Sequence, residues 1–419
     1  MTTSPVNTSR RDTARETAAS EAARPGTCAP VLMVAPQPFY EDRGTPIAIK
    51  QVLTALSQLG YRVDLLTYPV GASPEIPGVR YFRVANPLRI GAVPIGFSLR
   101  KLWLDAFLFT ALRRRLRERS YLCIHAVEEA AFLAVLAAQT YQAPVVYDMQ
   151  SSLAEQMAGR SLLSNALAGA ALTASERWLL RNCDWIITSI GLRPRVEAAN
   201  TRAPVREWRY AGASTPVAPA DVERLRASFE IAPSQPVVLY TGTFEDYQGL
   251  PLLLAAVPRV LAALPSVVFV LVGADGTKDN AALERMRIGS KIPRGALRLI
   301  ERQSRARMPA FLAMADVVVS PRNYGSNLPL KIFEYLAAGC AIVATSIPAH
   351  RAVLTDERAR LSTPTPEKLA DAISDLLTDQ SRAALLRRSA LAYAEENLDW
   401  LGFVRSVGEL YQEIRARSR

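Results

Sequence analysis

The sequence predicts an α/β protein made of two doubly wound, Rossmann-like domains of similar size that face each other across a cleft. Two observations support this fold class. Short, fully apolar segments alternate with segments of helical periodicity, and the alternation restarts after a Pro/Ala-rich stretch at residues 211–220. Apolar segments joined by helices are typical of parallel sheets that helices cover on both faces. The 419 residues also exceed the usual span of one hydrophobic core.

The first series of strands is predicted between residues 31 and 190. Its members are VLMVA (31–35), RVDLLT (62–67), LCIHAV (122–127), PVVYDM (144–149) and DWIITSI (184–190). The first intervening helix is expected to start after Thr45-Pro46 and to end at Gly60, because Pro favours the first helical position and Gly the end. We assign residues 30–212 to this N-terminal domain.

The second series repeats the pattern, and we assign residues 213–397 to it. Its strands are PVVLYTG (236–242), SVVFVLVG (266–273), LRLI (297–300), DVVVSP (316–321) and AIVAT (341–345). Helices are expected at 249–263 and after Pro329, the latter ending at Gly339. Ligands of parallel sheets bind outside the carboxyl ends of the strands, so the functional site is predicted where the strand ends of the two domains meet.

Several bulk features restrict the class of protein. Residues 1–29 are rich in Ser, Thr, Ala and Arg without an apolar run, which predicts a disordered tail and no signal peptide. The sequence contains no run of 18 apolar residues, so we predict no membrane-spanning helix. Cysteines stand far apart at Cys28, Cys123, Cys183 and Cys340, and the chain has 2 histidines. This pattern argues against a zinc site and favours a reducing cytoplasm.

The net charge of +11 predicts a surface that attracts phosphorylated ligands, nucleic acid or anionic lipid headgroups. The basic residues are scattered, and no recognised nucleic-acid-binding motif with interleaved aromatic residues is present. We therefore expect no nucleic-acid partner. A basic nucleic-acid-binding protein stays as an alternative function, and it would show salt-sensitive retention on DNA.

Three loops at predicted strand ends carry chemistry suited to anions: EDRGTP (41–46), TGTFEDYQGL (241–250) and SPRNYGSNLPLK (320–331). In the first, Gly44 lets the backbone approach a phosphate, with Thr45 as the N-cap residue and Pro46 as the first helical residue. Each loop taken alone could be an ordinary turn. Three of them at equivalent positions favour an anion site.

The third loop is the richest. Gly325, Ser326 and Asn327 precede a helix N-terminus whose free N–H groups suit an anion, and Arg322 and Lys331 bracket them with positive charge. The alternative is a capped helix behind a solvated loop.

Glu334 lies about one turn into the helix that follows this loop. A carboxylate among apolar neighbours must be paired, hydrogen-bonded or functional. It can accept hydrogen bonds from a ribose diol, as acidic residues do in nucleotide-binding folds. Loop amides for a diphosphate and a carboxylate for the sugar hydroxyls would together hold a nucleotide sugar. A structural salt bridge is the competing interpretation.

These segments resemble the retaining glycosyltransferases of family 4, which have the GT-B fold. The resemblance covers residues 30–416 and is carried by GTF…YQGLPLLLAA, SPR…GSNLPLKIFEYLAAGCAIVAT and WLGFVRSVGELYQEI. Within the family it points to a subgroup with a PLKIFEY-type donor motif. It implies transfer of a hexosyl unit, with retention, from a nucleotide diphosphate sugar to a lipid-linked, glycan or small-molecule acceptor. It also implies an N-terminal acceptor domain, a C-terminal donor domain, and a last helix within 398–419 that crosses back to the N-terminal domain.

The chain departs from the family pattern at several positions. The first acid of an E-x7-E pair is replaced by Ser326, the usual Arg and Lys fall at Thr243 and Gln248, and the cleft histidine falls at Val127. By charge, Arg322, Lys331 and Arg43 are the candidate replacements for binding the diphosphate. The departures leave two alternatives open, a catalytically inactive GT-B partner subunit and a nucleotide-sugar epimerase of the same fold.

The loops and the resemblance together give the candidate site. The donor-binding candidates are Arg43, Gly44, Thr45, Gly242, Thr243, Gln248, Arg322, Gly325, Ser326, Asn327, Leu328, Pro329, Lys331 and Glu334. The catalytic candidates are His125 and Glu128. Glu128 or Glu129 could orient the acceptor or stabilise positive charge at the sugar, with an ordinary pair at a helix N-terminus as the alternative. No metal site is expected, and no cofactor besides the donor substrate.

Residues 98–119, SLRKLWLDAFLFTALRRRLRER, form a basic amphipathic pattern. Leu99, Leu102, Trp103, Ala106, Phe107 and Leu112 can share one face, and arginines cluster after them. The pattern suggests contact with an anionic membrane surface, with an ordinary domain helix as the alternative. We therefore expect a cytoplasmic protein that is peripheral on the inner face of the cell membrane if this helix binds lipid.

Overall fold

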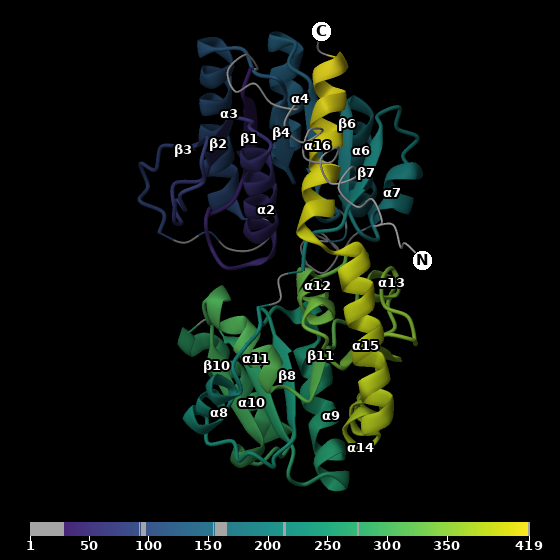
Figure 1. Cartoon of the computed structure of the whole chain (residues 1–419). Coiled ribbons are helices and arrows are strands. Elements are labelled where there is room, and N and C mark those ends of the chain that lie inside the picture. Colours follow the sequence, from purple (N-terminus) through teal and green to yellow (C-terminus); the bar gives the residue numbers. More distant parts are fainter. Residues whose placement is uncertain are drawn as a thin grey trace, which may run out of the picture.

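The computed structural model describes residues 29–91, 93, 98–153, 155, 166–212, 215–274 and 276–417. It contains two parallel sheets, each in its own α/β domain, and the N-terminal domain lies above the C-terminal domain in Figure 1. The predicted fold class is confirmed. The predicted tail lies outside the described residues except for Ala29.

The sheet of the N-terminal domain has the order β3-β2-β1-β4-β5-β6-β7, and every neighbouring pair is parallel. Its strands are β1 (Val31–Ala35), β2 (Val63–Thr67), β3 (Val79–Arg83), β4 (Ile124–Val127), β5 (Val145–Met149), β6 (Trp185–Ser189) and β7 (Val205–Trp208). Its helices are α2 (Gly44–Gln58), α3 (Leu99–Glu118), α4 (Ala130–Tyr141), α6 (Ala166–Asn182) and α7 (Arg193–Glu197). The strand order reverses between β1 and β4, so the segments after these two strands lie side by side at a switch point.

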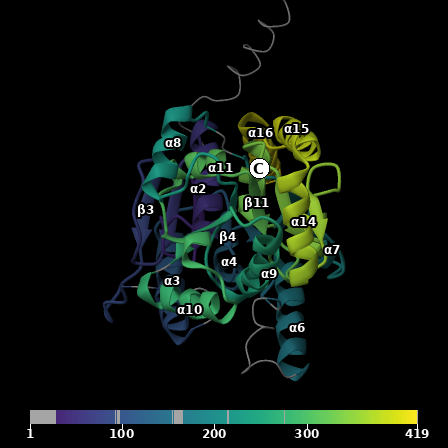
Figure 2. The ribbon, with the colours of Figure 1, turned by 90° about the horizontal axis from the view of Figure 1, so that it is seen from below.

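The sheet of the C-terminal domain has the order β10-β9-β8-β11-β12-β13 and is also parallel. Its strands are β8 (Val237–Thr241), β9 (Val268–Ala274), β10 (Leu297–Glu301), β11 (Val317–Ser320), β12 (Ile342–Thr345) and β13 (Arg360–Ser362). Its helices are α8 (Pro219–Ser228), α9 (Leu250–Ala263), α10 (Gly276–Gly289), α11 (Met308–Met314), α12 (Leu330–Ala337), α13 (Pro348–Arg351), α14 (Pro366–Thr378) and α15 (Gln380–Asn397). Figure 2 shows α8 and α11 on one side of this sheet and α9 and α10 on the other.

Three strands that the sequence did not predict, β3, β7 and β13, lie at or near the edges of the sheets. The segments VRYFR and VREW alternate charged with apolar residues, and most of their side chains are only half-buried. Continuous apolar runs mark strands that are covered on both faces. The strands β3 and β7 lack that signal, which explains why they were missed, and β13 is only 3 residues long.

The last helix, α16 (Trp400–Arg417), belongs to the N-terminal domain although it follows α15 of the C-terminal domain. Figure 1 shows α15 and α16 in yellow, running one after the other along the two domains. The Phe403, Val407 and Leu410 side chains of α16 pack in the same core as α2 and one face of the N-terminal sheet. The helices α3, α4 and α6 cover the opposite face.

Candidate active site

The loop after β11 is folded around the side chain of Arg322, which is buried. Its Nε donates to the Tyr324 carbonyl at 2.8 Å, and its Nη1 and Nη2 donate to the Asn327 carbonyl and side-chain oxygens at 3.0 and 2.9 Å. Gly325 has a positive φ of 114°, and a Cβ there would lie 2.3 Å from Arg322 Nη2. The loop therefore needs glycine at this position to close over the guanidinium.

Lys331, in the first turn of α12, faces the end of β8. Its Nζ donates to the Thr241 carbonyl at 3.1 Å and to Gln248 Oε1 at 3.3 Å, and lies 4.2 Å from the centre of the Tyr240 ring. Burial, with the charge of Arg322 nearby, lowers the pKa of Lys331 to about 7. Within the described residues, neither cation forms an ion pair with an acid. Two neighbouring cations that lack an acidic partner would bind an anionic ligand favourably, because the anion would supply the missing counter-charge.

The other candidates of the second loop lie around Lys331. Gly242 follows β8 directly and hydrogen-bonds to β9 through its N–H and the Val272 carbonyl at 3.0 Å. The Thr243 carbonyl accepts a hydrogen bond from Tyr240 Oη at 2.7 Å. Gln248 supplies a neutral amide where the resembled family would carry a lysine, and Lys331 reaches it from the neighbouring helix.

Glu334 forms an ion pair with Arg305, whose Nη2 lies 2.7 Å from Glu334 Oε1. Burial raises the pKa of Glu334, and the charge of Arg305 opposes this rise. The pair lines a cavity of about 850 Å³ with residues 215–217, α8 and the segment 305–312. The salt bridge considered as the alternative role of Glu334 is thus present. Arg305 was missed because its only sequence signal is its place shortly after β10.

The RGTP loop of the N-terminal domain faces this ion pair. The charges of Arg305 and Glu334 both influence the pKa of Tyr40, which burial and the hydrogen bond to Asp42 raise. The helix α2 begins at Gly44, and Arg43 is its N-cap residue. The prediction of Thr45 as N-cap was wrong, because Gly44 already has helical geometry. Within the described residues, the Arg43 side chain makes no capping hydrogen bond to this end of α2 and instead pairs with Glu41 at 3.2 Å.

Glu128 stands at the end of β4 in a left-handed backbone conformation, with φ of 52°. Such a conformation is costly for a residue with a side chain and is often found at functional sites. The Ser151 hydroxyl donates to Glu128 Oε1 at 2.8 Å. Burial, reinforced by the charges of Glu129 and Asp148, raises the pKa of Glu128 well above its usual range. Glu129 instead forms an ion pair with Lys101.

His125 lies in the core, with no exposed surface. Its Nδ1 lies 2.7 Å from Tyr411 Oη of α16, and its Nε2 lies 3.2 Å from Asp148 Oδ2. Asp148 Oδ1 accepts from the Gln150 amide at 2.5 Å, and the Gln150 carbonyl accepts from the Asn327 amide at 3.1 Å. The predicted catalytic role does not fit this position, because His125 points inward from β4 and cannot reach a substrate here. It connects α16 to the loop after β11.

The remaining part of that loop contacts the N-terminal domain. The Leu328 N–H donates to the Ile190 carbonyl at 3.0 Å. Ser326, which replaces the first acid of the family pattern, hydrogen-bonds to the Glu155 carboxylate through its N–H at 3.0 Å. Pro329 is the N-cap residue of α12, and Gly339, with φ of 61°, follows the end of this helix as predicted.

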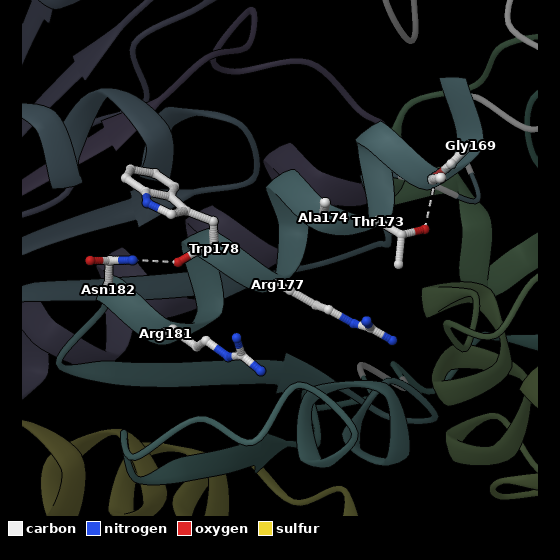
Figure 3. Close-up of a pocket in the computed structure, with 8 residues that line it drawn as sticks. Gly169, Thr173, Ala174, Arg177, Trp178, Arg181 and Asn182 are labelled. Atoms are coloured by element: carbon white, nitrogen blue, oxygen red, sulfur yellow. Dashed lines mark hydrogen bonds between the residues drawn. The ribbon is translucent and has the colours of Figure 1, made fainter. Parts of the chain in front are cut away.

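A second surface depression lies along α6 and is lined by residues of that helix alone, with a volume of about 560 Å³. Figure 3 shows Arg177 and Arg181 extending to one side of the helix and Trp178 to the other. Among the described residues, no groups from different elements converge there, so we do not assign it as an active site.

No three or more His, Cys, Asp or Glu residues cluster as metal ligands would, within the described part of the chain. In the same part, no helix is both long and apolar enough to cross a bilayer. The three cysteines that the structure describes, Cys123, Cys183 and Cys340, are buried and unpaired with one another.

Two parallel-sheet domains that face each other through basic loops are the arrangement of the GT-B fold. The comparisons with known proteins agree. Residues 43–190 match the model of the glycosyl transferase 4-like domain, and residues 235–379 match that of the glycosyl transferases group 1. Together these matches span more than half of the chain, which is a glycosyltransferase of the GT4 type.

Individual relatives support the same class. The chain is 25% identical over 396 residues to a phosphatidyl-myo-inositol mannosyltransferase of Mycolicibacterium smegmatis, covering 91% of this chain and 93% of that protein. Among solved structures, a sucrose-phosphate synthase from Thermosynechococcus elongatus superposes with a TM-score of 0.77 at 19% identity, covering 93% of this chain and 100% of the other. HepE of Anabaena, in complex with UDP-glucose, superposes with a TM-score of 0.72 at 18% identity, covering 92% of this chain and 100% of the other.

Proposed function

We propose that the protein transfers a hexosyl unit from a nucleotide diphosphate sugar to an acceptor, with retention of anomeric configuration. The observation that carries this proposal is a pair of cations without an acidic ion-pair partner among the described residues: the buried Arg322, after β11, and the partly buried Lys331, whose Nζ contacts the end of β8. Burying charge without a counter-ion is costly, and a bound diphosphate would remove that cost. A structural neighbour that contains UDP-glucose supports this choice of donor.

The chemical contribution of these residues would be electrostatic. As the bond between sugar and diphosphate breaks, negative charge grows on the leaving phosphate. Hydrogen bonds to Asn327 and Thr241 hold Arg322 and Lys331 in place before a ligand binds, so their remaining N–H donors would stabilise that charge with little reorganisation. The N–H groups at the start of α12 and α2 would add weaker stabilisation. The remaining effect is the positioning of donor and acceptor.

Glu128 is the residue that we propose to face the acceptor. Its raised pKa favours the protonated form, which can donate a hydrogen bond to a hydroxyl group of the acceptor or accept one from it. His125 would act as a positioning residue, because it holds Asp148 and, through Gln150, the loop after β11. A lipid-linked acceptor is supported by the relatives named as phosphatidyl-myo-inositol mannosyltransferases.

The proposal can be tested by measuring thermal stability with UDP-, GDP-, ADP- and TDP-sugars. A donor at 100 times its dissociation constant should stabilise the fold by ~2.7 kcal/mol. Turnover with a panel of acceptors, followed by NMR of the product anomer, then tests transfer and retention. Binding without turnover would favour the inactive partner subunit, and no binding to any of the four would contradict the proposal.

Glu334→Gln is expected to weaken nucleotide-sugar affinity about tenfold, because it removes the charge that a ribose diol prefers. Arg305→Gln breaks the same ion pair but keeps that charge, so affinity should stay within about threefold of the wild type. Isothermal calorimetry measures both. If the two variants lose stability equally and keep full affinity, Glu334 serves only the ion pair.

The surface of α3 gives the membrane proposal a more specific form. Leu104, Leu108 and Leu112 are fully buried, whereas Leu102 and Trp103 are 49% and 45% exposed. The predicted common face was therefore wrong, because Leu112 points into the core. Arg114 is exposed, while Arg115 packs its guanidinium 4.3 Å from the Phe82 ring centre. Lipid contact would thus use Leu102, Trp103 and Arg114.

Replacing both Leu102 and Trp103 with Ser is expected to lower the affinity for anionic vesicles roughly tenfold. Fully burying an apolar side chain contributes ~1.5–3 kcal/mol, and each substitution removes part of that free energy from membrane binding. Vesicle co-sedimentation at low and high salt measures this. Activity on a water-soluble acceptor should stay unchanged. Leu385→Ser, at a residue 58% exposed on the other domain, is the control. Equal sedimentation of all forms would make α3 an ordinary domain helix.

A further inference from the structure

Glu155, a residue of the N-terminal domain, contacts the loop after β11 in the C-terminal domain. Its Oε2 accepts a hydrogen bond from the Ser326 N–H at 3.0 Å, and its Oε1 accepts one from the Ser326 hydroxyl at 2.6 Å. The two residues are 171 positions apart in the chain. One carboxylate of the first domain thus binds two donors of a single residue in the second.

The backbones of the two domains are also in close contact at this point. A Cβ on Gly191 would lie 2.1 Å from the Ser326 carbonyl oxygen, so no larger residue fits there without a shift. The Leu328 N–H and the Asn327 amide donate to carbonyls of the N-terminal domain, at 3.0 and 3.1 Å. The position of Glu155 opposite Ser326 therefore follows from the packing of the main chains.

The guanidinium of Arg195 holds Glu155 in orientation, and a second carboxylate, Glu176, fixes Arg195. Arg195 Nη1 lies 3.6 Å from Glu155 Oε1, and Arg195 Nε donates to Glu176 Oε1 at 2.5 Å. Glu176 is itself buried and accepts hydrogen bonds from the Ser152 hydroxyl and the Leu153 N–H, both at 2.9 Å. This arrangement restricts the rotamer of Glu155 before any ligand binds.

Glu155 nevertheless keeps the capacity to bind a ligand. Its side chain is 33% exposed, and an ionised carboxylate can accept about four hydrogen bonds, of which Ser326 supplies two. Burial lowers the pKa of Arg322, and the charge of Glu155 acts against that shift. The carboxylate therefore lies near the cation that would bind the diphosphate.

The charge of Glu155 indicates which part of a donor it could bind. A carboxylate repels phosphate oxygens but accepts strong hydrogen bonds from hydroxyl groups. In a nucleotide diphosphate sugar, the group next to the diphosphate on one side is the glycosyl unit, which carries several hydroxyls. A carboxylate beside the diphosphate site is suited to that unit.

We propose that Glu155 binds hydroxyl groups of the donor's glycosyl unit, so that a residue of the N-terminal domain selects a sugar held by the C-terminal domain. This inference rests on the proposed function. Arg322 and Lys331 both belong to the C-terminal domain, whereas the sugar site would be complete only when the two domains are in contact. Affinity for the sugar and affinity for the nucleoside diphosphate should then depend on different residues.

The test compares two ligands on the full-length chain, a nucleoside diphosphate and its matching nucleotide sugar, by isothermal calorimetry. Glu155→Gln keeps the shape and removes the charge. It is expected to weaken nucleotide-sugar affinity by roughly tenfold or more and to leave nucleoside-diphosphate affinity within about twofold. Glu155→Asp, which keeps the charge but shortens its reach, should show the same selective loss to a smaller extent. Glu197→Gln, at an exposed ion pair on α7, is the matched control and should change neither affinity.

Equal loss of both affinities would overturn the inference, since it would show that Glu155 only holds the domains together. Unchanged affinity for both ligands in Glu155→Gln would overturn it as well. Failure of the proposed function is distinguishable, because the wild type itself would then bind neither ligand. If Glu155→Gln does not fold, the selectivity ratio of Glu155→Asp decides the question.

Discussion

Replacing Lys331 with Met is expected to lower kcat/KM by roughly 10- to 100-fold, the effect of losing one charged hydrogen bond to phosphate. Met retains contact with the Tyr240 ring and removes only the charge and the hydrogen bonds. Arg382→Ala, an exposed basic residue of α15, is the control and should leave activity unchanged. Full nucleoside-diphosphate affinity in Lys331→Met would place the diphosphate elsewhere.

The same residue predicts a specific pH dependence. Burial lowers the pKa of Lys331 from 10.5 to about 7 in the ligand-free protein, and a bound diphosphate would raise it again. Diphosphate binding above pH 7 should therefore take up a proton, and affinity should fall as pH rises. Calorimetry in two buffers of different ionisation enthalpy measures the proton uptake, which the Met variant should lack.

Stability gives an independent check of this pKa. Between pH ~7 and 10.5 the unfolded chain binds a proton at Lys331 that the folded chain does not, so the free energy of unfolding should rise with pH. Below pH ~7, Lys331 is protonated in both the folded and the unfolded chain, so its contribution to the free energy of unfolding does not change with pH. Relative to Lys331→Met, the wild type should therefore gain stability from pH 7 to pH 10. Parallel stability curves would contradict the lowered pKa.

Deletion of residues 400–419 is expected to abolish the folded protein. It removes the α16 side chains Phe403, Val407, Leu410, Tyr411 and Ile414, which are at most 3% exposed. At ~1.5–3 kcal/mol for each side chain, the loss is about 10 kcal/mol, comparable to the whole free energy of unfolding of a domain. The measurement is the yield of soluble monomer and its circular dichroism. A soluble, cooperatively melting deletion variant would show that α16 is dispensable.

A milder change isolates the polar part of this helix. Tyr411→Phe removes the hydroxyl that lies 2.7 Å from His125 Nδ1 and should lower the free energy of unfolding by ~1–3 kcal/mol. Glu409→Gln, on the exposed side of α16, should change it by less than about 0.5 kcal/mol. Urea denaturation measures both. Equal stabilities would mean that water replaces the hydroxyl.

The sequence predicted the central strands because these are buried on both faces and their composition alone reveals them. It also placed Arg322 after a strand and Lys331 at the start of the next helix, as the structure has them, because loops at strand ends can be recognised from the local pattern; their role in binding stays a prediction. Glu155 and Arg305 could not be found in this way, because their roles depend on contacts across 171 and 29 positions, respectively, with Ser326 and Glu334. Likewise, the burial of His125 depends on α16, whose Tyr411 follows it by 286 positions.

The path of α16 has a consequence for how the protein is made. Arg206, in the last strand of the first sheet, hydrogen-bonds to Glu413, which follows it by 207 residues. At a synthesis rate of about 5–20 residues per second, roughly 10–40 s pass between the two. During this time part of the apolar face of the N-terminal sheet lacks its cover, because α16 is synthesised only after the whole C-terminal domain. The N-terminal domain can therefore complete its core only after the C-terminal domain has been synthesised.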